Sequence, residues 1–198
     1  MDYKGQNKED QFIIEYFDGL TDANLLDIGA FDGKTFSNSF NLLTYFNWYG
    51  VLIEAEPKTA HDCYENTKDL EALTLCAAVT VDYDGIIDFH TSNGQMVGSS
   101  DMNHVKKWSK DVTFNRINVA AISIDTIVQT YGTEFAFINI DVEGQSADLA
   151  IKIIPLFKDC RCICIEHDNR YDELRDLAWA NGYTKELAFN AENIIFAK

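Results

Sequence analysis

The 198-residue sequence has no apolar stretch near the roughly 18 to 20 residues that a membrane-spanning helix requires. Its first ten residues, MDYKGQNKED, are charged from the second position onward and contain no apolar run typical of a signal peptide. We therefore expect a cytoplasmic protein without membrane insertion.

Basic residues are scarce, because 16 lysines and arginines stand against 32 aspartates and glutamates, for a formal net charge of -16. No basic run offsets this charge locally, and an acidic surface repels a phosphate backbone. We expect no nucleic-acid partner. Hydrophobic residues make up 46% of the chain, which is enough for one domain, over residues 1–198, with a substantial core.

The five cysteines include no C-x-x-C pair. Cys160, Cys162 and Cys164 alternate within CRCICIE, and this spacing predicts that all three lie on one face of a strand. We interpret them as small buried core residues in a reducing compartment, and a metal site is the alternative interpretation.

The G-x-G-x-x-G fingerprint of dinucleotide-binding proteins is also missing. In LLDIGAFDGKTFSNSF, residues 25–40, the glycines have the spacing G-x-x-x-G and are accompanied by Asp27 and Asp32. Two acids at such a turn disfavour a pyrophosphate and, with it, a nicotinamide-dependent oxidoreductase. They favour a ligand that carries an ammonium or sulfonium group, because a buried carboxylate is stable only beside a cation or hydrogen-bond donors.

Strand-like and helix-like segments alternate along most of the chain, which predicts an α/β doubly wound fold with a mostly parallel sheet of about seven strands. A short helix within an N-terminal helical segment, residues 1–20, precedes the sheet, and the last strand is antiparallel. The predicted strands are residues 24–28, 51–54, 73–79, 117–121, 135–141 and 160–166, a hairpin around 82–85 with its second arm at 86–90, and a closing pair at 183–189 and 193–196. The predicted helices are residues 9–17, 35–46, 57–68 starting at Pro57, 124–131 between Ser123 and Gly132, 147–157, and 171–181.

Acidic residues stand at the ends of four predicted parallel strands, and the carboxyl ends of such strands line one edge of the sheet. These acids are Asp27, Glu54, Asp141 and Glu166. Glu54 follows the glycine turn by about 25 residues, where an acid accepts hydrogen bonds from the hydroxyls of a ribose. A cationic adenosine derivative such as S-adenosylmethionine satisfies both this acid and the acids of the turn.

Five segments, in this order, resemble the FkbM-type family of S-adenosylmethionine-dependent methyltransferases, which are class I, Rossmann-like enzymes. The segments are DIGAFDGKTFSN, IEAEP, CAAVT, FINIDVEGQSADL and ICIEHDN, which lie within residues 27–169, and the resemblance covers roughly residues 24–196. D-V-E-G followed about 20 residues later by I-E-H is the most specific part. One departure is Asn139, where many members of the family have a lysine.

The resemblance implies a set of cofactor-binding residues. Asp27, Gly29 and Gly33 would hold the methionine part, Glu54 the ribose, and the segment 76–78, with Ala77 and Ala78, the adenine edge. The charge of Asp32 at the same turn adds this residue to the expected cofactor site. The resemblance also implies O-methylation of a hydroxyl on a small-molecule or saccharide acceptor. A non-catalytic binding or scaffolding module with the same fold is the alternative.

A hydroxyl acceptor must lose a proton, which requires a nearby base or a metal ion. The candidates are Asp141, Glu143, Glu166 and His167. Three interpretations remain open here: His167 or Glu143 acts as the base, Asp141 and Glu166 bind Mg²⁺ through oxygen atoms, or Glu143 caps the following helix and His167 is only structural.

Residues 91–116 form a polar stretch too long for a simple connection in a compact domain. It is either a flexible surface loop or a lid over the edge of the sheet. As a lid it would bring Ser99, Ser100, His104 and Trp108 to the acceptor, with Trp108 available to stack on a sugar ring.

Overall fold

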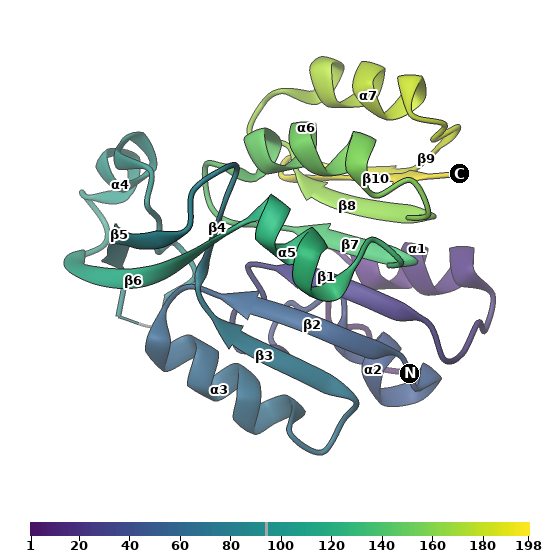
Figure 1. The fold of residues 1–198 in the computed structure, drawn as a ribbon, viewed down its shortest axis with the longest axis horizontal. Coiled ribbons are helices and arrows are strands. Elements are labelled where there is room, and N and C mark those ends of the chain that lie inside the picture. The colour runs from purple at the N-terminus through teal and green to yellow at the C-terminus, as the bar shows by residue number, and fades with distance from the viewer. Residues whose placement is uncertain (94) are drawn as a thin grey trace.

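A seven-stranded sheet forms the centre of the computed structural model, which describes residues 1–93 and 95–198. The strand order is β3-β2-β1-β7-β8-β10-β9, and β10 runs antiparallel to both of its neighbours while β1, β2, β3, β7 and β8 are parallel (Figure 1). This confirms the predicted α/β fold with an antiparallel last strand. The strands are β1 (Asn24–Ile28), β2 (Tyr49–Glu54), β3 (Ala72–Cys76), β7 (Phe137–Ile140), β8 (Cys162–Glu166), β9 (Lys185–Phe189) and β10 (Asn193–Ala197).

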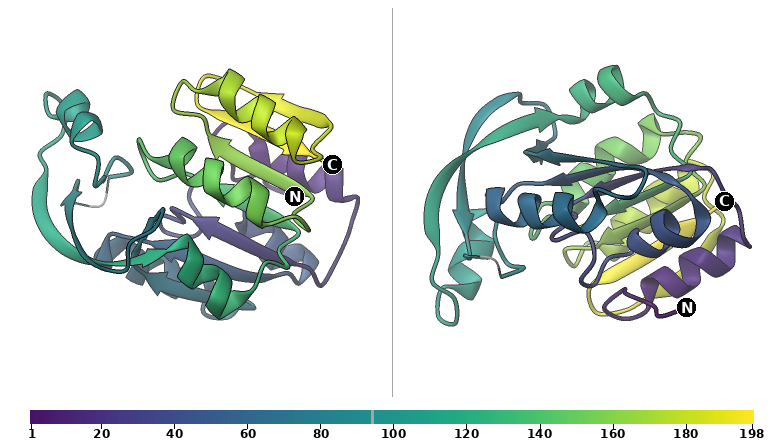
Figure 2. Two further views of the ribbon diagram at one scale, coloured as in Figure 1. Left: turned by 45° about the horizontal axis from the view of Figure 1, so that its top comes forward. Right: turned by 90° about the horizontal axis from the view of Figure 1, so that it is seen from below.

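Helices cover both faces of this sheet (Figures 1 and 2). They are α1 (Glu9–Phe17), α2 (Phe40–Phe46), α3 (Pro57–Thr67), α5 (Ile124–Tyr131), α6 (Ser146–Leu156) and α7 (Tyr171–Ala180). Each face has its own apolar core. Successive strand residues point to opposite faces, so Leu26 packs with α5, α6 and α7, whereas Leu25 packs with α1, α2 and α3.

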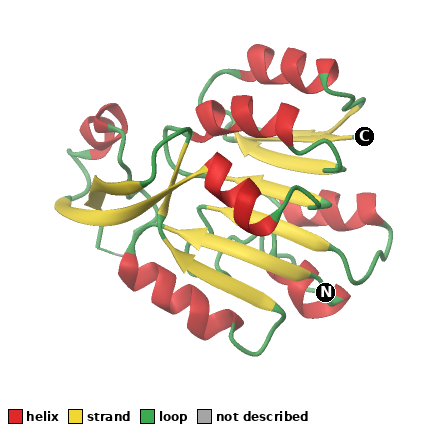
Figure 3. Cartoon of the chain, in the orientation of Figure 1, coloured by secondary structure: helices red, strands yellow, loops and turns green. Residues whose placement is uncertain are grey.

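A second, three-stranded sheet stands beside the carboxyl ends of the main one and appears apart from it at the left of Figure 3. Its order is β4-β6-β5, from β4 (Ala78–Thr80), β5 (Gly85–Thr91) and β6 (Asn115–Ser123), and a short helix, α4 (Met102–Trp108), follows β5. Two predictions are wrong here. Residues 73–79 are not one strand, because the chain leaves the main sheet at Ala77, and β4 and β5 do not form a hairpin, because β6 lies between them.

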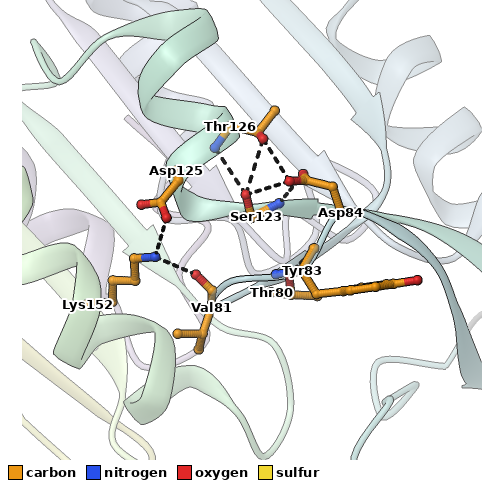
Figure 4. A network of polar contacts seen from close by, with 8 residues as sticks. All are labelled: Thr80, Val81, Tyr83, Asp84, Ser123, Asp125, Thr126 and Lys152. Carbon is orange, nitrogen blue, oxygen red and sulfur yellow. Dashed lines mark hydrogen bonds and ion pairs between the residues drawn. The ribbon is translucent and has the colours of Figure 1, made fainter.

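A side-chain network explains why the turn after β4 does not close a hairpin. Asp84 accepts hydrogen bonds from the backbone N–H and the hydroxyl of Ser123 and from the hydroxyl of Thr126 (Figure 4). The Ser123 hydroxyl also accepts from the backbone N–H of Thr126 and caps α5, as predicted. The turn is therefore attached to the junction of β6 and α5 rather than to β5 alone.

The helix predicted over residues 35–46 begins only at Phe40, and this is a further correction. Asp32 accepts hydrogen bonds from the backbone N–H groups of Lys34 and Thr35, and the Ser37 hydroxyl accepts one from Phe40. Such local bonds offer the backbone an alternative to a helix. Phe36 also has a φ of 54°, which no right-handed helix permits.

The three clustered cysteines are fully buried and free, but they do not share one face. Cys162 and Cys164 belong to β8 and pack on the side of α1 and α2. Cys160 precedes the strand and packs in the opposite core. The predicted alternation is therefore wrong for Cys160, because alternation holds only within the strand. In the described part of the chain, no helix has the length and apolar character that crossing a membrane requires.

Candidate active site

A cavity of about 760 Å³ lies along the carboxyl ends of β1, β2, β7 and β8. The segment that includes α4 forms its opposite wall, and the left view of Figure 2 shows this segment held away from the main sheet by β5 and β6. The cavity therefore lies at the edge where open parallel sheets bind ligands. Of the residues predicted for a site, it is lined by Gly29, Glu54, Ala77, Ala78, Ser100, His104, Trp108, Asp141, Glu143, Glu166 and His167.

Glu54 ends β2, lines the cavity and binds the backbone of the glycine turn. Its Oε2 atom accepts a hydrogen bond from the backbone N–H of Phe31 at 3.0 Å, and its Oε1 atom accepts one from Glu56 at 2.8 Å. Burial raises the pKa of Glu54 to about 7, with a smaller contribution from the charge of Glu56. Each oxygen keeps a further acceptor site for a ligand hydroxyl.

Gly29 permits the close approach of β1 and β7 at the floor of the cavity. Its φ is 84°, and a Cβ atom here would lie 1.7 Å from the backbone oxygen of Asp141. No other residue fits this position. Gly33, the second glycine of the turn, instead lies against Cys63 of α3, outside the cavity.

Asp27 and Asp32 do not line the cavity, so the edge expected to bring four acids together brings together only Glu54, Asp141 and Glu166. Asp27 is the penultimate residue of β1 and faces the core on the side of α1 and α2, where it is 2% exposed. Its Oδ1 atom accepts a hydrogen bond from Asn139, its partner on β7, at 2.9 Å, and burial raises its pKa.

The carboxylate of Asp32 accepts hydrogen bonds from groups of its own turn. Its carboxylate accepts hydrogen bonds from the backbone of Lys34 at 2.9 Å and from the backbone and the hydroxyl of Thr35, both at 2.6 Å. The carboxylate of Asp27 is therefore bound by the neighbouring strand, and that of Asp32 by its own turn.

Three acids gather where β7 and β8 end. Asp141 follows β7, Glu166 ends β8, and Glu143 lies in the loop between β7 and α6. Burial raises the pKa of Asp141, as do the charges of Glu166 and Glu143. Burial, followed by the charges of Glu166 and Glu192, raises the pKa of Glu143 to about 8. This end of the cavity therefore holds protons more tightly than isolated carboxylates do.

Side-chain geometry narrows the three interpretations of this cluster. Among residues 1–93 and 95–198, no three His, Cys, Asp or Glu side chains are arranged to hold a metal ion. The geometry therefore does not support a magnesium site at Asp141 and Glu166. Helix capping by Glu143 is wrong, because the first turn of α6 is instead bound by Asp168, which accepts a hydrogen bond from Ala147 at 2.9 Å.

His167 is held by backbone groups on both ring nitrogens. Nδ1 accepts a hydrogen bond from the backbone N–H of Asn169 at 3.1 Å, and Nε2 lies 3.3 Å from the carbonyl oxygen of Asn190. The ring also packs against Phe189, with centroids 5.4 Å apart. These contacts occupy the nitrogens that a base would need and favour Glu143 over His167.

The segment around α4 is docked on the loop that carries Glu143. Ser99 donates a hydrogen bond to the carbonyl oxygen of Glu143 at 2.7 Å, and Ser100 donates one to Gln145 at 3.0 Å. The Nε2 atom of His104 lies 3.3 Å from Oε2 of Glu143. Ser100, His104 and Trp108 line the cavity. Ser99 does not line it and instead connects the α4 segment to the loop that carries Glu143.

Comparison with known proteins identifies the family. The model of the Methyltransferase FkbM domain matches residues 27–184. The chain belongs to the FkbM methyltransferase family. This confirms the resemblance drawn from the sequence segments. A comparison with curated proteins gave no match.

Solved structures similar to this FkbM methyltransferase include three other methyltransferases, each 12% identical to it. They are a methyltransferase from Pyrococcus furiosus (TM-score 0.46, 95% of this chain and 81% of that chain covered) and precorrin-6y C5,15-methyltransferase from Geobacter metallireducens GS-15 (0.49, 98% and 88%). The third is a TehB-like SAM-dependent methyltransferase from Corynebacterium glutamicum (0.45, 96% and 86%). Similarity this low carries no information on the acceptor.

The FkbM methyltransferase also has cavity residues that its sequence did not reveal, among them Lys107 on α4 and Glu192 in the turn between β9 and β10. Burial, followed by the charge of Lys107, lowers the pKa of His104. Glu192 reaches the cavity because β10 inserts beside β8, an arrangement that no local pattern encodes. Lys107 lies within the predicted lid, but it belongs to no sequence motif that would mark it as a site residue.

Proposed function

We propose that this methyltransferase binds S-adenosylmethionine in the cavity and transfers its methyl group to a hydroxyl of a small-molecule or glycan acceptor. One observation carries the proposal. A single cavity extends from Glu54 and Gly29 to the acids Asp141, Glu143 and Glu166. It therefore offers a nucleoside site and a proton-accepting site within reach of one another.

The chemistry of the lining fits the cofactor. Glu54 can accept hydrogen bonds from ribose hydroxyls while it keeps its backbone partners. The lining near Glu54 is apolar and suits an adenine ring, and it includes Ile53, Ala77, Ala78, Val79 and Phe89. Acids dominate the rest, which suits a sulfonium better than a phosphate. When bound, S-adenosylmethionine supplies an electrophilic methyl group whose bond to sulfur breaks as a bond to the acceptor oxygen forms.

Glu143 is the residue that we propose accepts the hydroxyl proton. Its side chain is 24% exposed, lines the cavity and receives no hydrogen bond from the described residues. A pKa of about 8 makes its carboxylate a stronger base than an ordinary glutamate, near the pH at which enzymes work. The negative charge of Glu166 contributes to this raised pKa after burial.

Isothermal titration calorimetry tests the cofactor site. The protein should bind S-adenosylmethionine and S-adenosylhomocysteine but not NAD. Glu54→Gln should weaken binding roughly 10- to 100-fold, because a hydrogen bond to a charged group contributes about 1.5 to 3 kcal/mol. Glu71→Gln is the matched control, since Glu71 is exposed at the opposite end of the neighbouring strand.

Failure of the protein to bind either sulfur nucleoside would overturn the proposed function. Normal binding by Glu54→Gln would instead show that the ribose lies elsewhere in the cavity. Turnover is then measured with candidate hydroxyl acceptors, and methylation only at nitrogen or carbon would contradict the proposed acceptor atom.

A further inference from the structure

The acids around the Asp141 end of the cavity fall into two groups. Glu166 accepts a hydrogen bond from Ser146, Asp168 from the backbone of Ala147, and Asp101 from the backbone of Asn103. The remaining three carboxylates, those of Asp141, Glu143 and Glu192, receive no side-chain hydrogen bond from any described residue. The first group maintains the loops, and the second is left free to meet a ligand.

Positive charge is almost absent from this lining. Within residues 1–93 and 95–198, Lys107 is the only lysine or arginine that reaches the cavity. Burial raises the pKa of both Asp141 and Glu143, and the negative charge of Glu192, which lines the same cavity, adds a smaller contribution to each. Carboxylates removed from water are costly without donors or a counter-ion, and this applies to the partly buried Asp141 and Glu143, whereas Glu192 is exposed. The cofactor carries one net positive charge, which is fewer than the three carboxylates on this part of the lining.

A buried histidine points to the same place. His104 is 8% exposed, and its Nε2 atom has no hydrogen-bond partner in the described chain, although it lies 3.3 Å from Oε2 of Glu143. The indole N–H of Trp108, on the same helix, is also buried without a partner. Both residues line the cavity. Unsatisfied polar atoms of this kind fit a ligand that carries hydroxyl groups.

We propose that the methyl acceptor is a hydroxylated amine, of the amino-sugar or amino-alcohol class, whose ammonium group lies beside Asp141 and Glu192. Its hydroxyl then lies beside Glu143, on the side of the cavity that His104 and Trp108 line. This inference rests on the proposed function and names its substrate class. An ammonium needs no set coordination geometry, unlike a metal ion, and so suits carboxylates that the described chain does not arrange as a metal site.

Matched ligand pairs test the inference with the full-length protein saturated with S-adenosylhomocysteine. Calorimetry compares glucosamine with glucose, and galactosamine with galactose, with glucuronate as the anionic probe. In at least one pair the amine should bind about tenfold more tightly than the neutral sugar, and glucuronate should be the weakest ligand. Glu192→Gln should reduce this preference about threefold or more. Asp159→Asn, which removes an exposed acid before β8 at the opposite end of the sheet, should leave it unchanged.

Equal binding within both pairs, no binding by either pair, or preference for glucuronate would each overturn the inference. So would a preference that Glu192→Gln and Asp159→Asn reduce equally, because that would reflect net charge alone. Binding of S-adenosylhomocysteine is measured first in the same samples. Its absence overturns the proposed function, whereas its presence without an amine preference overturns only the substrate class.

Discussion

Glu143 has an unusual conformation for a side chain that faces a cavity. Its φ is 54°, in the left-handed region, and Gly144 follows with a φ of 93°. Two successive residues with positive φ turn the chain sharply between β7 and α6. The turn carries the carboxyl group of Glu143 toward α4 and away from the first turn of α6, where Asp168 accepts the hydrogen bond of the Ala147 backbone N–H instead.

The pH dependence of turnover should report Glu143. Only its carboxylate can accept a proton, so kcat/KM for a hydroxyl acceptor should rise with pH and level off above about 8. Glu143→Gln should lower kcat by about 100-fold or more without changing the affinity for S-adenosylhomocysteine. Steady-state kinetics between pH 6 and pH 9 measure both effects.

His167→Gln provides the comparison for this experiment. It disturbs backbone contacts rather than the proposed base, so the rising limb of the pH profile should remain. A Glu143→Gln enzyme that retains the same limb would show that another group accepts the proton.

At the scale of elements, the α4 segment and the loop between β7 and α6 form one joint. Ser99 and Ser100 connect the two, and Gly144 allows them to approach. A Cβ atom on Gly144 would lie 3.1 Å from both Asp101 and His104. The wall of the cavity that should select the acceptor is therefore held against the loop that carries the proposed base.

Gly144→Ala should separate this joint. The φ of 93° and the tight contacts should together cost about 1 to 3 kcal/mol of unfolding free energy. Urea denaturation measures this loss, and acceptor kcat/KM and hydrogen exchange over residues 99–108 report the wall itself. Hydrogen exchange over residues 99–108 should be much faster than in the wild-type protein, and acceptor kcat/KM should be much lower.

Gly132→Ala is the matched control for that substitution. Gly132 has a φ of 77°, but nothing lies within 4 Å of the added Cβ atom. The Gly132→Ala variant should therefore be less stable than the wild-type protein, with unchanged kcat/KM and unchanged hydrogen exchange at α4. Equal effects of the two variants on kcat/KM would contradict a specific role for the joint.

Elements with strong local signals could be predicted from the sequence. The helix of residues 124–131 begins after Ser123 and ends at Gly132 as expected, and Pro57 begins α3. Elements that depend on distant partners could not. The start of α2 could not be predicted, because side chains within residues 32–40 form hydrogen bonds with the backbone in place of a helix. The division of residues 73–79 could not be predicted either, because β3 and β4 pair with strands of different sheets.

At the scale of the whole molecule, an acidic cavity lies within an acidic protein. The chain has a formal net charge of -16, and eight acids among residues 1–93 and 95–198 line the cavity. Burial raises the pKa of Glu54 to about 7 and that of Glu143 to about 8. Each of these two carboxyl groups therefore keeps its proton to a higher pH in the folded protein than in the unfolded chain.

Stability without ligand should therefore fall as the pH rises. A raised carboxyl pKa contributes stability that is complete below about pH 4.5 and is lost as the pH passes through about 7 for Glu54 and about 8 for Glu143. Each group should account for about 1 to 3 kcal/mol, since one pKa unit corresponds to about 1.4 kcal/mol. Urea denaturation at pH 5.5 and pH 8.5 measures the difference.

A double variant separates the cavity from the overall charge. Glu54→Gln with Glu143→Gln should flatten the pH dependence, whereas Asp159→Asn, at an exposed site, should preserve it. An unchanged slope in the double variant would contradict the raised pKa values. Saturation with S-adenosylmethionine should also reduce the slope in the wild-type protein, because a cation stabilises the ionised carboxylates.

Four features can be recognised in the amino-acid sequence because each is a local pattern of side chains. They are the alternation of strands and helices, the glycine turn, the acid that ends β2 and the segments of an FkbM methyltransferase. Only the three-dimensional packing places Asp27 against Asn139 rather than in the cavity and brings Glu192 to the cavity that Asp141 also lines. It also decided that α4 reaches Glu143. Strand order and register arise from packing between distant segments, and these non-local contacts determine which acids share the site.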